Sequence, residues 1–251
     1  MARPRLLLVI AAAFGVAAIG GFLVFQQFLA GDSVPALTLA PTTTPGASAT
    51  VAPTIGAGGT SAPVDATPVG IAGTWSVGDG SVVGYRVREQ LGGVTAVTDA
   101  VGRTSAVMGS ATIEADGGGL RVSAAAFEAD LTQLASDDGR RDNRIRSMGV
   151  ESDRFPTATF TLTAPVAVGA DALAGATVDV SLFGDLTIHG VTKAVTIAGQ
   201  ARLNGDRIEI VAALTFPFSD FGMTPPSLGG FVQVQNDATL EILLSLAKAV
   251  G

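Results

Sequence analysis

The residues best suited to chemistry are a single histidine and a short stretch rich in carboxylates. His189 is the only histidine of the chain, and the chain contains no cysteine. A histidine that acts as a general base needs a positioned partner, and no serine stands in the G-x-S-x-G pattern of a nucleophile elbow. We therefore expect no catalysis by His189 and no enzyme activity. Hydrogen bonding of its ring within a turn is the simpler interpretation.

The acidic stretch runs from residue 137 to residue 154. Paired carboxylates could catalyse glycoside hydrolysis, and clustered carboxylates could hold a cation. Arginines alternate with these carboxylates, so an ion-paired loop is the more economical interpretation. With one imidazole and no thiol in the chain, we predict no metal site. The acidic residues are Asp137, Asp138, Asp142, Glu151 and Asp153, and the basic ones are Arg140, Arg141, Arg144, Arg146 and Arg154.

The charge balance argues against nucleic acid as a partner. The chain has 22 acidic and 15 basic residues. Arg3 and Arg5 precede the first apolar segment, so the part after residue 31 carries 13 basic groups against 22 acidic ones, a net charge of −9. A surface of this sign repels phosphates and anionic lipid headgroups.

The N-terminus has the pattern of a membrane span. Residues 6–25 carry no charge, and 20 helical residues at about 1.5 Å each cross the roughly 30 Å hydrocarbon core. Arg3 and Arg5 before this segment and Asp32 after it place the N-terminus in the cytoplasm. We predict an anchor over residues 1–30, with a single pass through the cell membrane and an extracytoplasmic C-terminal domain. A cleaved signal peptide, which would leave a secreted domain, stays open as the alternative.

Residues 31–72 have the composition of a disordered linker. Prolines are scattered among Thr, Ala, Ser and Gly, and no aromatic residue occurs. Such a segment buries too little apolar area to offset its ordering entropy. As a free coil, its 42 residues would span roughly 35 to 40 Å.

From residue 73 to residue 251 the hydrophobic pattern has a period of two, which predicts antiparallel β-structure. Asn204-Gly205 and His189-Gly190 are tight hairpin signals. Long strands with one apolar face must close on themselves or pair with another sheet. We favour a single eight-stranded barrel over a sandwich, with a loop or short helix at one barrel end over residues 140–155. The predicted inner wall comprises Val178, Val180, Leu182, Leu186, Val195, Ile197, Ile208, Ile210, Leu214, Phe216, Leu240 and Ile242.

Several short motifs go beyond periodicity. They are L-T-I-H-G-V-T-K over residues 186–193, Arg141-Asp142, F-P-T-A-T-F over residues 155–160, Trp75, and F-S-D-F-G-M over residues 218–223. Together, and in the order in which they follow one another along the chain, they resemble the YceI-like family of lipid- and polyisoprenoid-binding proteins. The resemblance implies a lipocalin-like barrel, commonly periplasmic or secreted, that encloses a long isoprenoid such as a polyprenyl lipid or a quinone. It implies neither an enzyme nor a cofactor beyond the bound lipid. The chain departs from the family pattern at Arg144, which replaces a histidine, and at residues 148–151.

These observations lead to competing hypotheses of function. The first is a membrane-tethered carrier or reservoir for an isoprenoid, with Arg141, Arg144 or His189 meeting its headgroup at the barrel mouth. The second is a non-catalytic interaction module whose barrel is filled by its own side chains, and the third is a hydrolase that uses His189. Small inward residues such as Gly184 and Ala201 favour a cavity, whereas Phe216 and Phe218 could fill it. A homodimer is compatible with every one of these hypotheses.

Overall fold

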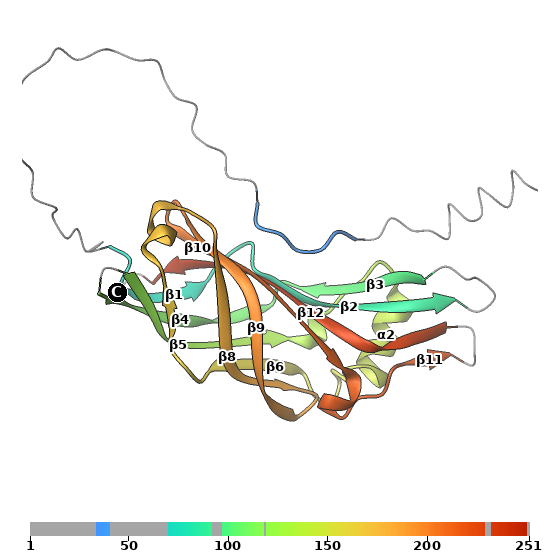
Figure 1. The fold of residues 1–251 in the computed structure, drawn as a ribbon. Helices are drawn as coiled ribbons and strands as arrows, with labels where there is room; N and C mark the ends of the chain where they lie inside the picture. Colours follow the sequence, from blue (N-terminus) through green and yellow to red (C-terminus); the bar gives the residue numbers. More distant parts are fainter. Residues whose placement is uncertain (1–33, 41–69, 92–96, 118, 229–231, 250–251) are drawn as a thin grey trace, which may run out of the picture.

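The computed structural model describes residues 34–40, 70–91, 97–117, 119–228 and 232–249 (Figure 1). The predicted anchor over residues 1–30 lies outside these residues, as does most of the predicted linker. Over the part of the chain that is described, no helix is both long and apolar enough to span a bilayer. Residues 34–40 of the linker are an extended segment that is hydrogen-bonded to the folded domain.

The folded domain is a closed antiparallel barrel, as predicted. Its strands follow one another round the ring, and the last of them pairs back with the first. Every pairing in the sheet is antiparallel. In spatial order the eight strands of the ring are β1 (Gly73–Val77), β4 (Val107–Asp116), β5 (Gly119–Asp130), β6 (Thr157–Leu162), β8 (Val178–Ile188), β9 (Val191–Asn204), β10 (Arg207–Pro217) and β12 (Val232–Lys248).

A hairpin outside the eight-stranded ring extends the sheet beside β12. β2 (Val82–Leu91) pairs with the first part of β12, and β3 (Val97–Thr104) pairs with β2. The free edge of β3 is met by the backbone of Ala135, which exchanges two hydrogen bonds of 2.8 and 3.0 Å with Arg103. The short strands β7 (Val166–Val168) and β11 (Ser227–Leu228) pair with β5 and β12.

Short helices connect the strands near the ends of the barrel. α2 (Gly139–Met148) overlaps the stretch of residues 140–155, where a loop or short helix is predicted. Asp138 is its N-cap, and the Asp138 carboxylate accepts a 2.8 Å hydrogen bond from the backbone N–H of Arg140, which satisfies one of the free donors of the first turn. The other helices are the 3-10 turns η1 (Leu131–Gln133), η2 (Ala170–Ala174) and η3 (Phe218–Phe221).

The hairpin at His189-Gly190 has the predicted geometry. Ile188 pairs with Val191, and both loop residues have positive φ, 53° and 73°. Positive φ at both central positions is the two-residue turn whose twist matches that of the strands. The ring of Phe155 lies against Gly190, where a Cβ atom would come within 2.8 Å of it, so glycine is required for space as well as for conformation.

The core consists of two clusters that share the barrel interior. One surrounds Phe160, Ile197 and Phe221, and the other surrounds Trp75 and Leu246. Gly184, interpreted from the sequence as a small residue that opens a cavity, instead makes room for a ring. A Cβ atom at position 184 would lie 2.4 Å from the Phe160 ring.

Candidate functional site

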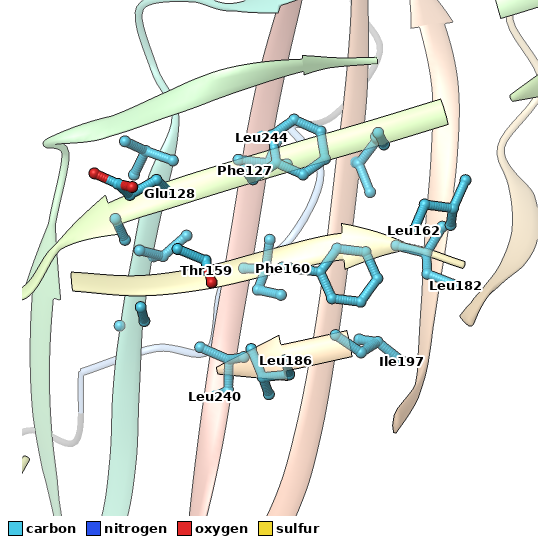
Figure 2. Close-up of a pocket in the computed structure, with 18 of the residues that line it drawn as sticks. Phe127, Glu128, Thr159, Phe160, Leu162, Leu182, Leu186, Ile197, Leu240 and Leu244 are labelled. Atoms are coloured by element: carbon cyan, nitrogen blue, oxygen red, sulfur yellow. The ribbon is translucent and has the colours of Figure 1, made fainter. Parts of the chain in front are cut away.

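The barrel encloses a cavity of about 230 Å³. Residues of β2 and of every ring strand except β1 line it, and Ile145 and Val150 on the α2 side and Leu173 of η2 extend the lining toward the ends. Almost all lining residues are aliphatic or aromatic, and Figure 2 shows Phe127, Phe160 and leucines from several strands around the space. The side chains with polar groups in the lining are Tyr85, Glu128, Thr159 and Thr239.

Most of the predicted inner wall does face this cavity. The predicted residues that line it are Val180, Leu182, Leu186, Ile197, Ile208, Ile210, Phe216, Leu240 and Ile242. Val195 and Leu214 pack against the core cluster instead, and Val178 is half-buried in β8. Phe216 and Phe218 belong to the cavity wall and leave the space beside them open.

The predicted inner wall includes no residue of β4 or β5. In β5 the register with β4 shifts between Val122 and Ala124, so that no residue of β4 stands opposite Ser123. Val122 and Ala125 both line the cavity, so the inward phase changes by one residue at this bulge. The run of small residues around this shift is the signal that could have revealed it.

Tyr85 is the polar group of most interest inside the barrel. Its hydroxyl is buried and has no hydrogen-bond partner among the described residues. The ring occupies space left by Gly102, where a Cβ atom would come within 2.3 Å of it. Burial raises the pKa of Tyr85 well above its usual value, Arg141 lowers it, and the carboxylates of Asp142, Glu89 and Asp137 raise it further. The phenol is therefore a neutral donor.

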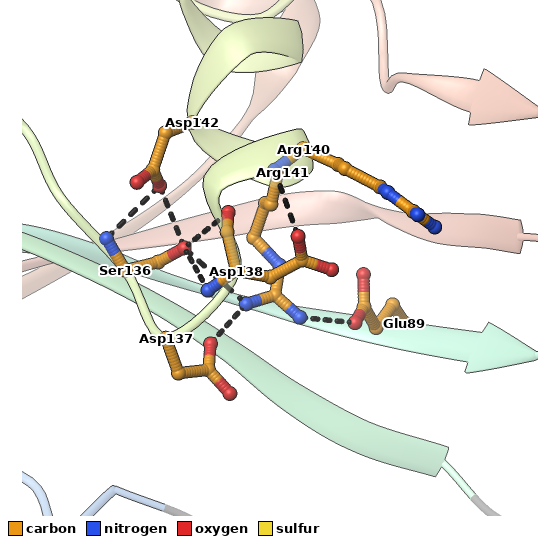
Figure 3. A network of polar contacts seen from close by, with 7 residues as sticks. All are labelled: Glu89, Ser136, Asp137, Asp138, Arg140, Arg141 and Asp142. Carbon is orange, nitrogen blue, oxygen red and sulfur yellow. Dashed lines mark hydrogen bonds and ion pairs between the residues drawn. The ribbon is translucent and has the colours of Figure 1, made fainter.

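Arg141 lies in a network of ion pairs beneath the start of α2 (Figure 3). Its Nη2 is 2.9 Å from Glu89 Oε1, and its Nη1 donates to Asp137. Burial alone would lower the pKa of Arg141, but Glu89 and Asp137 raise it, so the guanidinium stays charged. Asp142 accepts hydrogen bonds of 2.9 and 2.6 Å from the backbone N–H and the hydroxyl of Ser136. This network agrees with the predicted ion-paired stretch.

The three predicted headgroup residues are not part of the cavity lining. Arg141 is engaged as described, and Arg144 is half-buried on α2. His189 stands in its hairpin turn with Nδ1 3.3 Å from the Phe221 carbonyl, Nε2 3.3 Å from Glu151, and its ring 4.3 Å from that of Phe155. The ring of His189 therefore contacts other segments rather than its own turn.

The arrangement can bind an apolar molecule in the interior. Where side chains are described, no three His, Asp or Glu residues are grouped as a metal site would need. The interior offers long apolar walls, and the Tyr85 hydroxyl is buried in the wall without a hydrogen-bond partner among the described residues. A chain-like ligand with few polar groups can pack against such walls, and a hydrogen-bond acceptor on it would pair with the Tyr85 hydroxyl.

The fold and the site define an all-β protein with a closed antiparallel barrel around an apolar cavity. Residues 76–246, more than half of the chain, match the family model of the YceI-like domain, and the chain belongs to that family. The barrel is similar to the structure of a polyisoprenoid binding domain from Saccharophagus degradans implicated in plant cell wall breakdown. The TM-score is 0.52 at 16% identity, over 71% of this chain and 99% of that one.

Curated relatives are UPF0312 proteins of Vibrio. The protein from Vibrio vulnificus (strain YJ016) is 32% identical over 113 residues, and that from Vibrio parahaemolyticus is 33% identical over 113 residues. Each match covers 42% of this chain and 56% of the relative. The chain therefore spans little more than half the length of these relatives.

Proposed function

We propose that this barrel binds a long-chain isoprenoid lipid in its cavity and carries or stores it outside the cytoplasm. The observation that supports the proposal is the apolar wall, which runs along the interior from Leu246 and Ile208 to Ile145 and Val150. Along β10, the cavity runs past the eight residue steps from Ile208 to Phe216, roughly 26 Å at about 3.3 Å per residue. A slender chain fits such a path better than a compact ligand of the same mass.

The energetics favour a hydrocarbon. At about 0.8 kcal/mol per buried methylene, each five-carbon isoprene unit contributes roughly 4 kcal/mol before ordering costs. A few units are enough for useful affinity. The polyisoprenoid binding domain of Saccharophagus degradans, which shares the fold, is named for the same class of ligand. The proposal is a binding function without catalysis, since His189 stands outside the cavity lining.

The polar end of the ligand is proposed to contact Tyr85, rather than Arg141, Arg144 or His189. The Tyr85 hydroxyl is buried, neutral and unpaired, whereas Arg141 is held by Glu89 and Asp137. Around Tyr85 the carboxylates outnumber the guanidinium groups that act on it. Such surroundings disfavour a phosphate and favour a neutral acceptor, so a quinone-type carbonyl is preferred over a polyprenyl phosphate.

The proposed location is the extracytoplasmic face of the cell membrane. Its support is the sequence of residues 1–30, an uncharged apolar stretch preceded by two arginines. The membrane is then both the attachment site and the source of the lipid. Fractionation of host cells, followed by protease treatment of intact spheroplasts, tests this placement. Protection of the barrel from the protease would contradict it.

The binding proposal is tested by solvent extraction and mass spectrometry of the full chain, purified from the envelope of its own host. We expect a stoichiometric isoprenoid with a neutral carbonyl. Ala201→Phe, which adds a ring to the cavity wall of β9, should reduce the bound lipid about tenfold. Ala198→Phe adds the same ring to an exposed position of the same strand and should retain the lipid. A stable barrel that carries no lipid would contradict the proposal and favour the interaction module.

A further inference from the structure

We infer that the outer wall of the barrel is a docking surface for residues 34–40 of the same chain, which bind across it as an extended peptide. Figure 1 shows this segment in blue alongside the barrel. Three arginines on three different strands hold it through backbone carbonyls. Arg86 of β2 donates to the Val34 carbonyl at 2.8 Å, Arg103 of β3 to that of Pro35 at 2.6 Å, and Arg202 of β9 to that of Ala40.

Ion pairs within the barrel hold these arginines in place independently of residues 34–40. Arg86 Nε lies 2.7 Å from Glu241, and its Nη1 lies 2.9 Å from Asp99. Arg103 shares Glu241 at 2.9 Å, and Arg202 Nε donates to Glu209 at 2.8 Å. A guanidinium held in this way has little side-chain freedom left to lose when it binds a carbonyl. The wall is therefore prepared to recognise a main chain rather than a particular side chain.

Burial on the outer wall supports a permanent cover. Glu241 and Arg202 are each only 4% exposed, although their chain neighbours Ile242 and Ala201 line the cavity on the other side of the sheet. Outward side chains of a barrel normally meet water, and buried charges are tolerated when they are paired and hydrogen-bonded. Residues 34–40 supply the hydrogen bonds that lie over these charges.

The sequence of the segment fits an apolar strip between the arginine anchors. Leu37 and Leu39 are half-buried, whereas Ala36 and Thr38 are exposed, which is the alternation of an extended peptide on a surface. The register places Val211 beside Leu243 on the outer face of β10 and β12, between the anchors. No residue from 34 to 40 carries a charge.

The segment crosses the wall diagonally. Across the sheet, Arg86 and Arg202 are three strand-to-strand steps apart, about 14 Å, and along it the register offsets them by six residues, about 20 Å, which gives about 24 Å between the two anchors. The carbonyls of Val34 and Ala40 are six residue steps apart, which can span at most about 20 Å, and the long arginine side chains at both ends cover the difference. Pro35 helps to keep the start of the segment extended, because it restricts both its own φ and the residue before it.

Docking of residues 34–40 shortens the free part of the linker. A free linker of residues 31–72 would let the barrel move several tens of ångströms from the membrane. With residues 34–40 docked, only residues 31–33 remain between the predicted anchor and the barrel wall, about 10 Å when extended. This consequence rests on the proposed anchor, whereas the docking itself does not depend on the anchor or on the lipid.

Spin labels test the docking directly, because the chain has no cysteine of its own. We would label the full chain at Thr38→Cys and Lys193→Cys, two exposed positions, and measure the distance between the labels. Docking predicts one narrow distance distribution. Leu37→Asp with Leu39→Asp replaces two half-buried apolar side chains with charged ones, and we expect the narrow component to fall about tenfold. Ala36→Asp, an exposed position, should leave that component unchanged.

Two outcomes would overturn the inference. A broad distribution in the doubly labelled chain without further changes would mean that the segment is not held. A short distance in a mixture of chains that each carry a single label would mean that the segment of one copy docks on another. Thermal unfolding of each variant, followed by circular dichroism, shows that the barrel itself is intact.

Discussion

The inner and outer walls of this barrel bury their residues by opposite chemistry. Inside, aliphatic and aromatic side chains surround a cavity, and Tyr85 of its wall has a buried hydroxyl with no hydrogen-bond partner among the described residues. Outside, Glu241 and Arg202 are buried as charges, each with a partner of opposite sign. The inner wall can therefore accept a flexible apolar chain of undefined register, whereas the outer wall fixes an extended backbone at defined points. One sheet provides both, because successive residues face opposite sides.

The largest effect should come from the outer wall. Glu241→Ala leaves Arg86 and Arg103 without a carboxylate that they share, and loss of one partner of a buried ion pair costs about 3–5 kcal/mol. Glu114→Ala removes the carboxylate of an exposed pair with Arg121 and should change stability little. Urea unfolding measures both. Equal losses would show that the outer charges contribute no more than surface pairs.

On the inner wall, the expected effect is on binding. Tyr85→Phe removes the proposed donor to the ligand carbonyl and should weaken quinone binding by about 1–2 kcal/mol, or roughly 5- to 30-fold. Binding of an isoprenoid hydrocarbon without a carbonyl should not weaken, since it leaves the hydroxyl unsatisfied in any case. Fluorescence titration with the two ligands makes the comparison. A parallel loss for both ligands would point to packing rather than to a hydrogen bond.

The buried phenol of Tyr85 should also make the stability of the fold depend on pH. Because burial raises the pKa of Tyr85 in the folded state, the folded chain keeps this proton where the unfolded chain loses it. The stabilisation is complete below the unfolded pKa, near 10, and is lost as pH rises above it, at up to about 1.4 kcal/mol per pH unit. Tyr85 is the only tyrosine, so ultraviolet absorbance follows its ionisation directly. Titration of the folded chain near pH 10 would contradict the buried, neutral phenol.

The smallest effect should be at α2, near the carboxylates that act on Tyr85. Asp138→Ala removes the N-cap and should cost about 1 kcal/mol in urea unfolding. The hydrogen bond from the Arg140 backbone lowers the pKa of Asp138, so this contribution is present at neutral pH and is lost as pH falls through that lowered pKa. Asp153→Ala, an exposed carboxylate beyond the helix, is the control and should leave stability unchanged. No loss at Asp138 would mean that packing alone holds α2.

Much of the barrel could be predicted because its strands are regular. The alternation from Val178 to Ile242 predicted nine residues of the cavity wall, and the His189-Gly190 turn predicted one hairpin. β3 does not show this alternation, since Ala100 and Val101 are adjacent and both buried, which hides a period of two. The bulge at Ser123 changes the inward phase of β5, a shift that no alternation pattern contains.

The sequence by itself determined the fold class, the antiparallel connections and the family, because these depend on local periodicity, turn residues and short motifs. Only the tertiary structure decided that Tyr85 lines the cavity and that Arg141 is held away from it by Glu89, since both residues owe their surroundings to residues distant in sequence. It also decided that residues 34–40 cross the outer wall. Their composition is that of a disordered linker, and the arginines that hold them come from three separate strands brought together by closure of the barrel.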